Sequence, residues 1–267
     1  MGAPDQEVGI SMAPPATRVY LSGRLTVEVA GRRLEPEAFP GRQGRIAFAL
    51  LVGERGTPLA RGLLADTIWD GSPPDAWDQA LSALASKLRA LLREVGMDDP
   101  GVLRGSGGCY ELHLPPGSWV DHEAALDAIH DAEAALRAGD PGAAYGPSAV
   151  AHHIARRPFL PGEEGRWIEE RRDRLRSILV RALECRTQVY LANHEAALAI
   201  EVARELVTLE PFRESGYRAL MRGHAAQGNG AEAIRVYEGC RAFLAEELGV
   251  GPSRETRALR DELLRAL

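Results

Sequence analysis

The sequence has no long apolar run, no secretion signal and few cysteines, and each absence narrows the kind of protein it encodes. No apolar stretch in its 267 residues approaches the roughly 20 residues needed to cross a bilayer. The first 17 residues contain no basic segment followed by an apolar one, so they do not form a secretion signal. Because they are rich in Pro, Ala and Gly, we expect them to form a disordered tail. The three cysteines, Cys109, Cys185 and Cys240, are odd in number and widely spaced, which favours reduced thiols. We therefore expect a cytoplasmic protein without a membrane partner.

Short motifs of metal, nucleotide and catalytic sites are also missing. The sequence contains no Cys-x-x-Cys, no His-Glu-x-x-His and no Gly-x-x-x-x-Gly-Lys-Ser/Thr. His152 and His153 are adjacent, so they point to different sides of a helix and make a poor metal pair. Ser106 lies in a glycine-rich turn without the strand–turn–helix setting of a hydrolase nucleophile. The glutamate pairs at 163–164 and 169–170 are typical of a solvated acidic surface. We therefore expect no enzyme activity, no metal and no cofactor.

The chain has no excess of positive charge. Its net charge is −6, and residues 19–121 carry 11 basic against 13 acidic side chains, while residues 122–267 carry 20 against 23. Any affinity for nucleic acid must therefore come from local clustering of cations rather than from the overall field. The length, with 45% hydrophobic and 26% charged residues, is typical of a soluble protein with two domains.

Residues 72–95 predict a helix with two different faces. On a 3.6-residue period one sector is apolar and comprises Trp77, Leu81, Leu84, Leu88, Leu91, Leu92 and Val95. The opposite sector carries hydroxyls, an amide and cations, interleaved with Ala83 and Ala90, and comprises Gln79, Ser82, Ser86, Lys87, Arg89 and Arg93. Such groups reach base edges and phosphates in a major groove, although a solvated amphipathic helix shows the same pattern.

The segments around this helix decide between the two interpretations. Residues 18–34 alternate apolar and polar around two glycines and predict two short strands. Helices are expected at 41–52 and about 60–68, and Asp75 is a plausible N-cap for the third helix. Residues 102–114 predict a hairpin around the glycine-rich turn 105–108. Strands, three helices and a hairpin are the order of a winged helix-turn-helix, in which the third helix enters the groove.

The second half is almost entirely helical. Its helices are expected at 122–137, 143–155 with an interruption at Gly146-Pro147, 166–191, 195–209, 213–227, 230–248 and 254–267. Residues 190–200 resemble 225–236 at an offset near 36, which is close to the tetratricopeptide period. The arginine-rich run 171–176 is expected to form i, i+4 pairs with neighbouring acids, or alternatively to contact DNA or an acidic partner.

Both halves resemble one family. In the first, LSGRLTVEVAGRRL, LLADTIWDGSPP, ALSALASKLRALL and GGCYEL are similar to the OmpR-type domain of the Streptomyces antibiotic regulatory proteins. In the second, Trp119-Val120-Asp121 and the ending EELGVGPSRETRAL resemble the bacterial transcriptional activator domain that follows it in that family. The resemblance implies a mainly α protein: a disordered tail at 1–17, a winged helix at 18–118, and an all-α tetratricopeptide-like repeat domain at 119–267.

The resemblance also implies which residues bind DNA. Those assigned to base-facing positions are Gln79, Ser82, Ala83 and Ser86, and those assigned to phosphate are Lys87, Arg89 and Arg93. Arg104 and Gly107 are assigned to the tip of the wing. Three residues depart from the family pattern, namely Lys87 in place of arginine, Asp78 in the first turn and Glu111 in the wing.

The expected function is a sequence-specific transcriptional activator of a specialised gene cluster such as antibiotic biosynthesis. The resemblance implies binding to direct repeats in double-stranded DNA, a homodimer on DNA, and contacts with RNA polymerase and its sigma factor. Two alternatives remain open. One is a protein-interaction adaptor with a degenerate DNA-binding domain, which the acidic net charge favours. The other is a ligand-sensing regulator, for which no pocket is marked in the sequence.

Overall fold

The computed structural model describes residues 17–266 and divides into two units, the first ending at Val120 and the second beginning at Asp121. The predicted tail at 1–17 lies outside the described residues, apart from Thr17 in the first strand. Within the described part, no helix is both long and apolar enough to cross a membrane.

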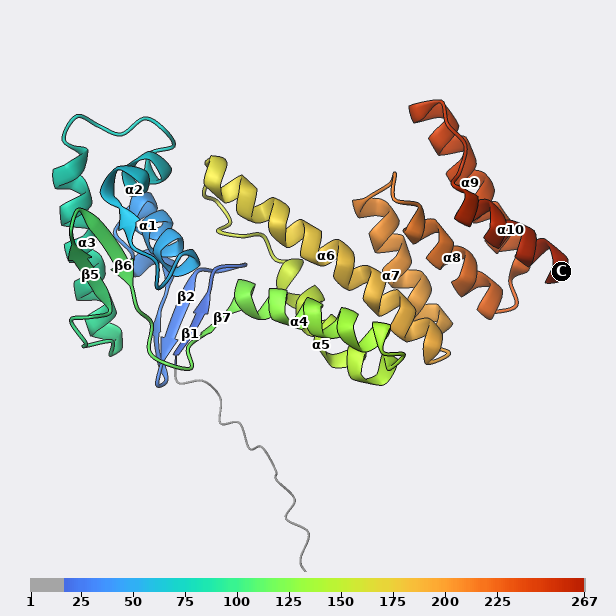
Figure 1. The fold of residues 1–267 in the computed structure, drawn as a ribbon, viewed down its shortest axis with the longest axis horizontal. Coiled ribbons are helices and arrows are strands. Elements are labelled where there is room, and N and C mark those ends of the chain that lie inside the picture. The colour runs from blue at the N-terminus through green and yellow to red at the C-terminus, as the bar shows by residue number, and fades with distance from the viewer. Residues whose placement is uncertain (1–16, 267) are drawn as a thin grey trace, which may run out of the picture. The chain divides into compact units, whose positions relative to one another are not determined.

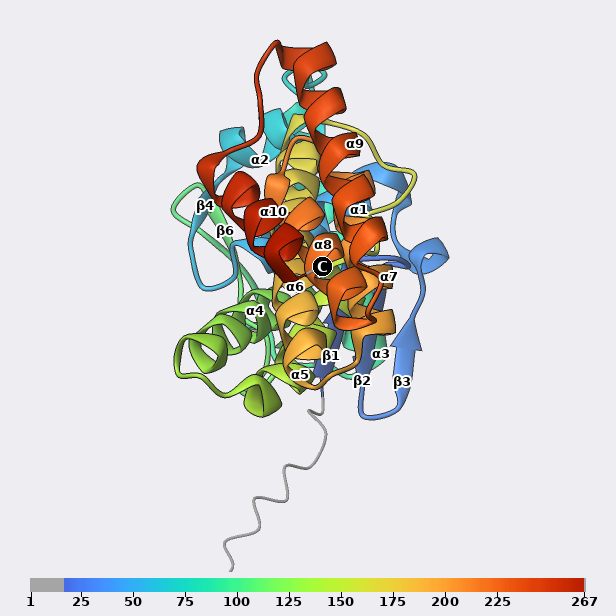
Figure 2. The ribbon, with the colours of Figure 1, turned by 90° about the vertical axis from the view of Figure 1, so that its right-hand side faces the viewer.

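The first unit begins with a small sheet. β1 (Thr17–Tyr20), β2 (Thr26–Val29) and β3 (Arg32–Leu34) form an antiparallel meander, seen side by side in Figure 2. We predicted two strands in residues 18–34, whereas the structure has three. The chain turns at Gly31, which has a positive φ of 85°, and continues as β3. β7 (Trp119–Val120) joins the sheet parallel to β1, giving the order β3-β2-β1-β7. Trp119 and Val120, which the sequence analysis assigned to the second domain, thus pair with the first strand of the first unit.

Three helices pack beside this sheet, after a short 3-10 turn at Pro36–Ala38. They are α1 (Gly41–Gly53), α2 (Arg61–Ile68) and α3 (Trp77–Val95). Six of the seven residues in the predicted apolar sector of α3 are buried, and Trp77 is half-buried. The prediction that Asp75 caps α3 was wrong. The N-cap residue is Ala76, and no side chain accepts a hydrogen bond from the first turn of the helix.

The wing is a second small sheet. β4 (Leu59–Ala60), β5 (Leu103–Ser106) and β6 (Cys109–Leu112) have the order β4-β6-β5. Ser106 pairs with Cys109, so the turn consists of Gly107 and Gly108, both with positive φ (57° and 76°). Positive φ at both central residues is the geometry of a type I′ turn, which glycine adopts without steric cost.

The second unit consists of seven helices, each of which packs against its neighbour in chain order (Figure 1). They are α4 (Asp121–Arg137), α5 (Pro141–Ala155), α6 (Arg166–Ala192), α7 (Ala196–Leu209), α8 (Glu214–Ala226), α9 (Gly230–Leu248) and α10 (Arg254–Ala266). The predicted interruption of α5 was wrong, since the helix runs through Pro147. Gly146 has no Cβ to collide with the proline ring, so the helix loses one backbone hydrogen bond without breaking.

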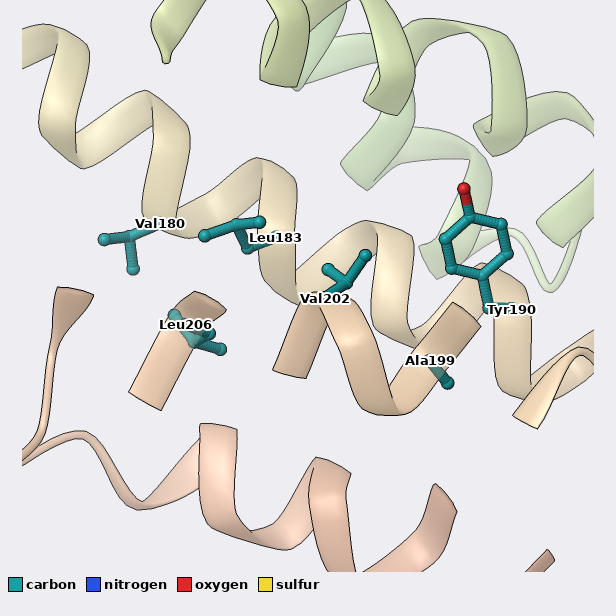
Figure 3. Close-up of a cluster of buried hydrophobic side chains, with 6 residues drawn as sticks. All are labelled: Val180, Leu183, Tyr190, Ala199, Val202 and Leu206. Atoms are coloured by element: carbon teal, nitrogen blue, oxygen red, sulfur yellow. The ribbon is translucent and has the colours of Figure 1, made fainter. Parts of the chain in front are cut away.

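Separate apolar clusters join successive helices of this unit. Figure 3 shows the cluster between α6 and α7, formed by Val180, Leu183, Tyr190, Ala199, Val202 and Leu206. The next, between α7 and α8, contains Ile200, Ala203, Ala219 and Leu220. At Gly223 the helices approach so closely that a Cβ would lie 2.6 Å from Cγ1 of Ile200. Repeated nearest-neighbour packing of this kind is typical of helical solenoids, as the tetratricopeptide-like pattern predicted.

The ending GPSRET docks α10 onto α8. The backbone N–H of Ser253 donates to both carboxylate oxygens of Glu214, at 2.9 Å each, and its hydroxyl donates to one of them at 2.8 Å. Thr256 is fully buried and accepts a hydrogen bond from Arg218 at 3.0 Å. Burial raises the pKa of Glu214, but hydrogen bonds from Thr256 and Ser253 outweigh it and lower the pKa below the ordinary 4.5. This part of the motif EELGVGPSRETRAL therefore forms a helix junction.

Within the run 171–176 of α6, Arg172 and Arg176 pair with acids, neither of them at i, i+4, and Arg174 has no ion pair with any residue between 17 and 266. Arg166 has an i, i+4 pair with Glu170, whereas Arg172 pairs with Glu169 at i, i+3. Arg172 also donates to the carbonyls of Phe159, Leu160 and Glu163, which fixes the loop before α6.

Two other predictions for this region need correction. Arg176 reaches Glu210 near the end of α7 at 2.8 Å, so one arginine of the run joins two helices instead of pairing within its own. Glu163 was expected on a solvated surface, yet it is 5% exposed because this loop folds against α6.

Burial raises the pKa of Cys185 and Cys240 to about 11, which keeps both thiols protonated at neutral pH.

Candidate nucleic-acid interface

The polar face of α3 is directed to solvent along most of its length. Of the seven residues predicted on this helix, five are exposed, namely Gln79, Ala83, Ser86, Lys87 and Arg93. Ser82 and Arg89 are half-buried. At the wing, Arg104 and Gly107 are both exposed. Most of the predicted residues are thus accessible to a large partner, and two are partly covered by the protein itself.

Arg61, the first residue of α2, covers Ser82. Its guanidinium binds the carboxylate of Asp78 at 2.7–2.8 Å and donates to the hydroxyl of Ser82 at 2.8 Å. It also donates to the phenol of Tyr110 in β6 at 2.8 Å. The hydrogen bond with Asp78 raises the pKa of Arg61 above its ordinary value. One side chain therefore connects α2, the first turn of α3 and the wing.

Arg89 also lies over the ring of Tyr110. Its guanidinium is 5.6 Å from the ring centroid of Tyr110, and that of Arg61 is 5.1 Å away. The Nε of Arg89 donates to the carbonyl of Leu103 in β5 at 2.9 Å. A Cβ at Gly105 would lie 2.9 Å from the Tyr110 ring, so the wing strand passes directly over this stack. These contacts hold the wing against α3, which is a role for Arg89 besides its predicted phosphate contact.

Three cations on α3 and the wing have no such engagement. Lys87, Arg93 and Arg104, which we call the unpaired cations, make no ion pair or side-chain hydrogen bond with any residue between 17 and 266. Lys87 is also the only lysine in the sequence. Exposed cations on a helix face and an adjacent hairpin have the chemistry to bind phosphates of a duplex.

Comparison with known proteins identifies the family. A model of the bacterial transcriptional activator domain matches residues 120–264, which is more than half of the chain. The chain belongs to this family. Together with the relatives below, the match also confirms the predicted resemblance to the Streptomyces antibiotic regulatory proteins.

Relatives of this activator-domain protein are regulators by name. It is 31% identical to the regulatory protein AfsR of Streptomyces coelicolor over 92% of its own length, and spans only 25% of AfsR. It is 29% identical to the transcriptional regulatory protein MoaR1 of Mycobacterium tuberculosis, covering 99% of this chain and 85% of the relative. A solved structure of Mycobacterium tuberculosis EmbR in complex with a low affinity phosphopeptide matches with a TM-score of 0.85 at 24% identity, over 95% of this chain and 66% of EmbR. That likeness confirms the predicted fold class.

The two acidic departures from the family pattern both have partners in the structure. Asp78, in the first turn of α3, is held by Arg61. Glu111 lies 3.0 Å from Nε2 of His113 in the same strand region. Neither carboxylate forms an ion pair with the unpaired cations, so neither neutralises the charge on the exposed face.

Arg61 and Tyr110 were missed by the sequence analysis of this activator-domain protein. Arg61 precedes Asp78 by 17 residues and Tyr110 by 49, so no helical or strand periodicity relates them. The sequence carried no direct signal for these contacts, because an exposed acid in the first turn of α3 is already favoured by the helix dipole. Among the described residues no group of three potential ligands is placed to hold a metal ion.

Proposed function

We propose that this protein is a transcriptional activator that binds direct repeats in double-stranded DNA through α3 and the wing. The observation that carries the proposal is the set of unpaired cations, Lys87, Arg93 and Arg104, beside exposed polar residues of α3. Because the overall charge is −6, a cluster of cations without carboxylate partners is the feature that can attract phosphates locally.

In this proposal base readout comes from the first half of α3. Gln79 is exposed, and its amide has the donor and acceptor pair that recognises adenine. Ser86 is also exposed, but its hydroxyl donates to the carbonyl of Ser82 at 2.9 Å, so it keeps only acceptor capacity for a base. Arg104 and the Gly107 turn approach the backbone or the minor groove from the wing.

The partners extend the same proposal. Pairing of two protomers on adjacent repeats would raise occupancy through effective concentration, which suits a DNA-binding unit with few cations. By the family resemblance, RNA polymerase and its sigma factor are the proteins that the bound activator recruits. A cytoplasmic, nucleoid-associated location belongs to the same proposal.

The test is selection from a pool of random duplexes at two salt concentrations, with the parent protein beside Lys87→Ala/Arg93→Ala. Arg89 is left in place because its removal would also detach the wing. Each lost phosphate contact lowers the slope of log affinity against log salt by about 0.9, so the double variant is expected to lose about two units of slope. A matched control is Arg235→Ala/Arg241→Ala, which removes the same charge from exposed pairs on α9.

A second readout uses the only lysine. An amine-reactive ester labels Lys87 and the N-terminal amine, so mass spectrometry of a single peptide reports the recognition helix. Selected DNA is expected to protect Lys87 from the label and to leave the N-terminus reactive. Enrichment of no sequence, with Lys87 equally reactive in the presence and absence of DNA, would overturn the proposal and favour the adaptor alternative.

A further inference from the structure

A pocket in the second unit is unrelated to the DNA-binding residues. It has a volume of about 280 Å³ and lies between the start of α4, the loop before α6 and the first half of α6. Its apolar surface is formed by Leu126, Phe159, Leu175 and Ile178, of which only Leu126 is exposed, at 43%. A pocket near 300 Å³ with mainly apolar walls and a few convergent polar groups is typical of small-molecule sites.

The polar groups of this pocket carry one sign of charge. Its lining includes the guanidinium groups of Arg171, Arg174 and Arg181 with the imidazole of His122, and it includes no carboxylate. Arg181 is neutralised by a bidentate pair with Glu133 at 2.7 Å, which lowers the pKa of Glu133. Arg171 lies over the ring of Trp167, 5.2 Å from its centroid.

Arg174 differs from the other two arginines. It is exposed and makes no ion pair or side-chain hydrogen bond with any residue in the described range 17–266. Nδ1 of His122, in the first turn of α4, is buried with no hydrogen-bond partner in that range, its nearest carboxylate being Asp121 at 3.9 Å. The guanidinium of Arg174 and Nδ1 of His122, neither of which has a hydrogen-bond partner in the described range, therefore belong to residues that line the pocket beside its apolar side chains.

We propose that this pocket binds a small organic anion, a molecule with an aliphatic or aromatic part and one carboxylate or similar acidic group. The apolar part packs on Leu126, Phe159 and Ile178, while the acidic group binds Arg174. No carboxylate belongs to the lining, and Glu133, which lies beside it, is already paired with Arg181. The site is separate from α3, and the proposal does not depend on DNA binding.

The experiment is calorimetric titration of the full chain with three probes that separate the two parts of the ligand. Octanoate has both the apolar chain and the charge, octanamide has the chain alone, and acetate has the charge alone. We expect octanoate to bind saturably at one site, octanamide about tenfold more weakly, and acetate at least about a hundredfold more weakly.

Two exposed positions give variants that leave the fold intact. Arg174→Gln removes the cation and is expected to weaken octanoate about tenfold while leaving octanamide unchanged. Ser177→Asp places a carboxylate in the lining and is expected to weaken octanoate further through repulsion. Arg257→Gln, an exposed arginine on α10, is the matched control and is expected to bind octanoate like the parent.

Three results would overturn the proposal. The first is the absence of saturable heat with octanoate. The second is equal affinity for octanoate and octanamide, which would show that charge plays no part. The third is an Arg174→Gln variant that binds octanoate as tightly as the Arg257→Gln control, which would place the anion elsewhere. Preserved thermal unfolding of each variant in the absence of ligand shows that a lost affinity is not a lost fold.

Discussion

On α6 most arginines lie beside carboxylates, whereas on α3 and the wing three cations have none. Arg166, Arg172 and Arg181 pair with Glu170, Glu169 and Glu133, respectively. Lys87, Arg93 and Arg104 have no such partners in the described chain. A paired arginine stabilises its own domain and presents little net charge, while an unpaired one leaves its charge available to a partner. Abundance of arginine is therefore a weaker guide to DNA binding than the absence of nearby acids.

The units also differ in how many elements a single side chain connects. In the second unit, successive helices meet in clusters such as Val180 with Val202 and Ile200 with Leu220. In the first unit, Arg61 joins residues 17 and 49 positions away. In the first unit, several contacts of α3 and the wing thus converge on one side chain and can be removed by a single substitution, whereas the solenoid distributes its packing over separate clusters.

The largest expected effect on stability follows from removing the side chain of Arg61. Arg61→Ala leaves Asp78 and the Tyr110 phenol without their donor, and we expect a loss of about 2 kcal/mol in the free energy of unfolding of the first unit. DNA affinity should fall by more than about tenfold because only Arg89 then holds the wing to α3. Urea unfolding and a binding titration measure the two effects.

Arg235→Ala is the control in the other unit. Its pair with Glu232 is an exposed i, i+3 contact, so its removal should change the free energy of unfolding by no more than about 0.5 kcal/mol. If Arg61→Ala proves as mild as Arg235→Ala, the network around Arg61 does not support the interface.

Helix approach in the second unit is tested by two glycine substitutions. At Gly223 a Cβ would lie 2.6 Å from Cγ1 of Ile200, so Gly223→Ala should cost about 1–3 kcal/mol of unfolding free energy. At Gly239, in the middle of α9, a Cβ meets nothing within 4 Å, so Gly239→Ala should stabilise by about 0.5–1 kcal/mol through helix propensity. Opposite signs in thermal unfolding are expected, and equal signs would contradict the close approach of α7 and α8.

The architecture was largely predictable from sequence because it rests on local signals. The periodicity of α3 lies within 19 residues, the glycine turn of the wing joins two adjacent strands, and the helices of the second half follow one another along the chain. The predictions that were wrong concern β3, β7 and the continuity of α5, which depend on contacts between elements. β3 and β7 exist because β1 and β2 offer free edges, and α5 continues through Pro147 because packing and Gly146 offset the weakened turn.

The candidate site was predictable in part. Exposure of Gln79, Ser86 and Lys87 follows from the helical period alone. The engagement of Ser82 and Arg89 does not, because both are held by groups brought in by tertiary folding, Arg61 and the Leu103 carbonyl. Which cations stay unpaired depends on where every acid lies in space, and that information is absent from a helical wheel.

A smaller effect concerns pH at the α8–α10 junction. The pKa of Glu214 is lowered in the folded chain, so its contribution to stability is present above its ordinary value of 4.5 and is lost as pH falls through the lowered folded value. Glu214→Gln should cost about 1 kcal/mol at neutral pH and should remove this part of the acid dependence. Unfolding midpoints measured from pH 7 to pH 3 test the prediction, and parallel curves for parent and variant would contradict it.

The smallest expected change compares two serines on α3. Ser86 is exposed, and its hydroxyl donates a hydrogen bond to the carbonyl of Ser82 in the preceding turn. Ser86→Ala should therefore stabilise the first unit by about 0.5 kcal/mol through helix propensity. The Ser82 hydroxyl accepts from Arg61, so Ser82→Ala should instead destabilise by about 1 kcal/mol. If Ser86 contacts a base, its substitution will raise stability while lowering discrimination among operator sequences, two changes of opposite sign in one protein. That opposition distinguishes a side chain kept for recognition from one kept for folding, and a Ser86→Ala variant with unchanged discrimination would remove Ser86 from the interface.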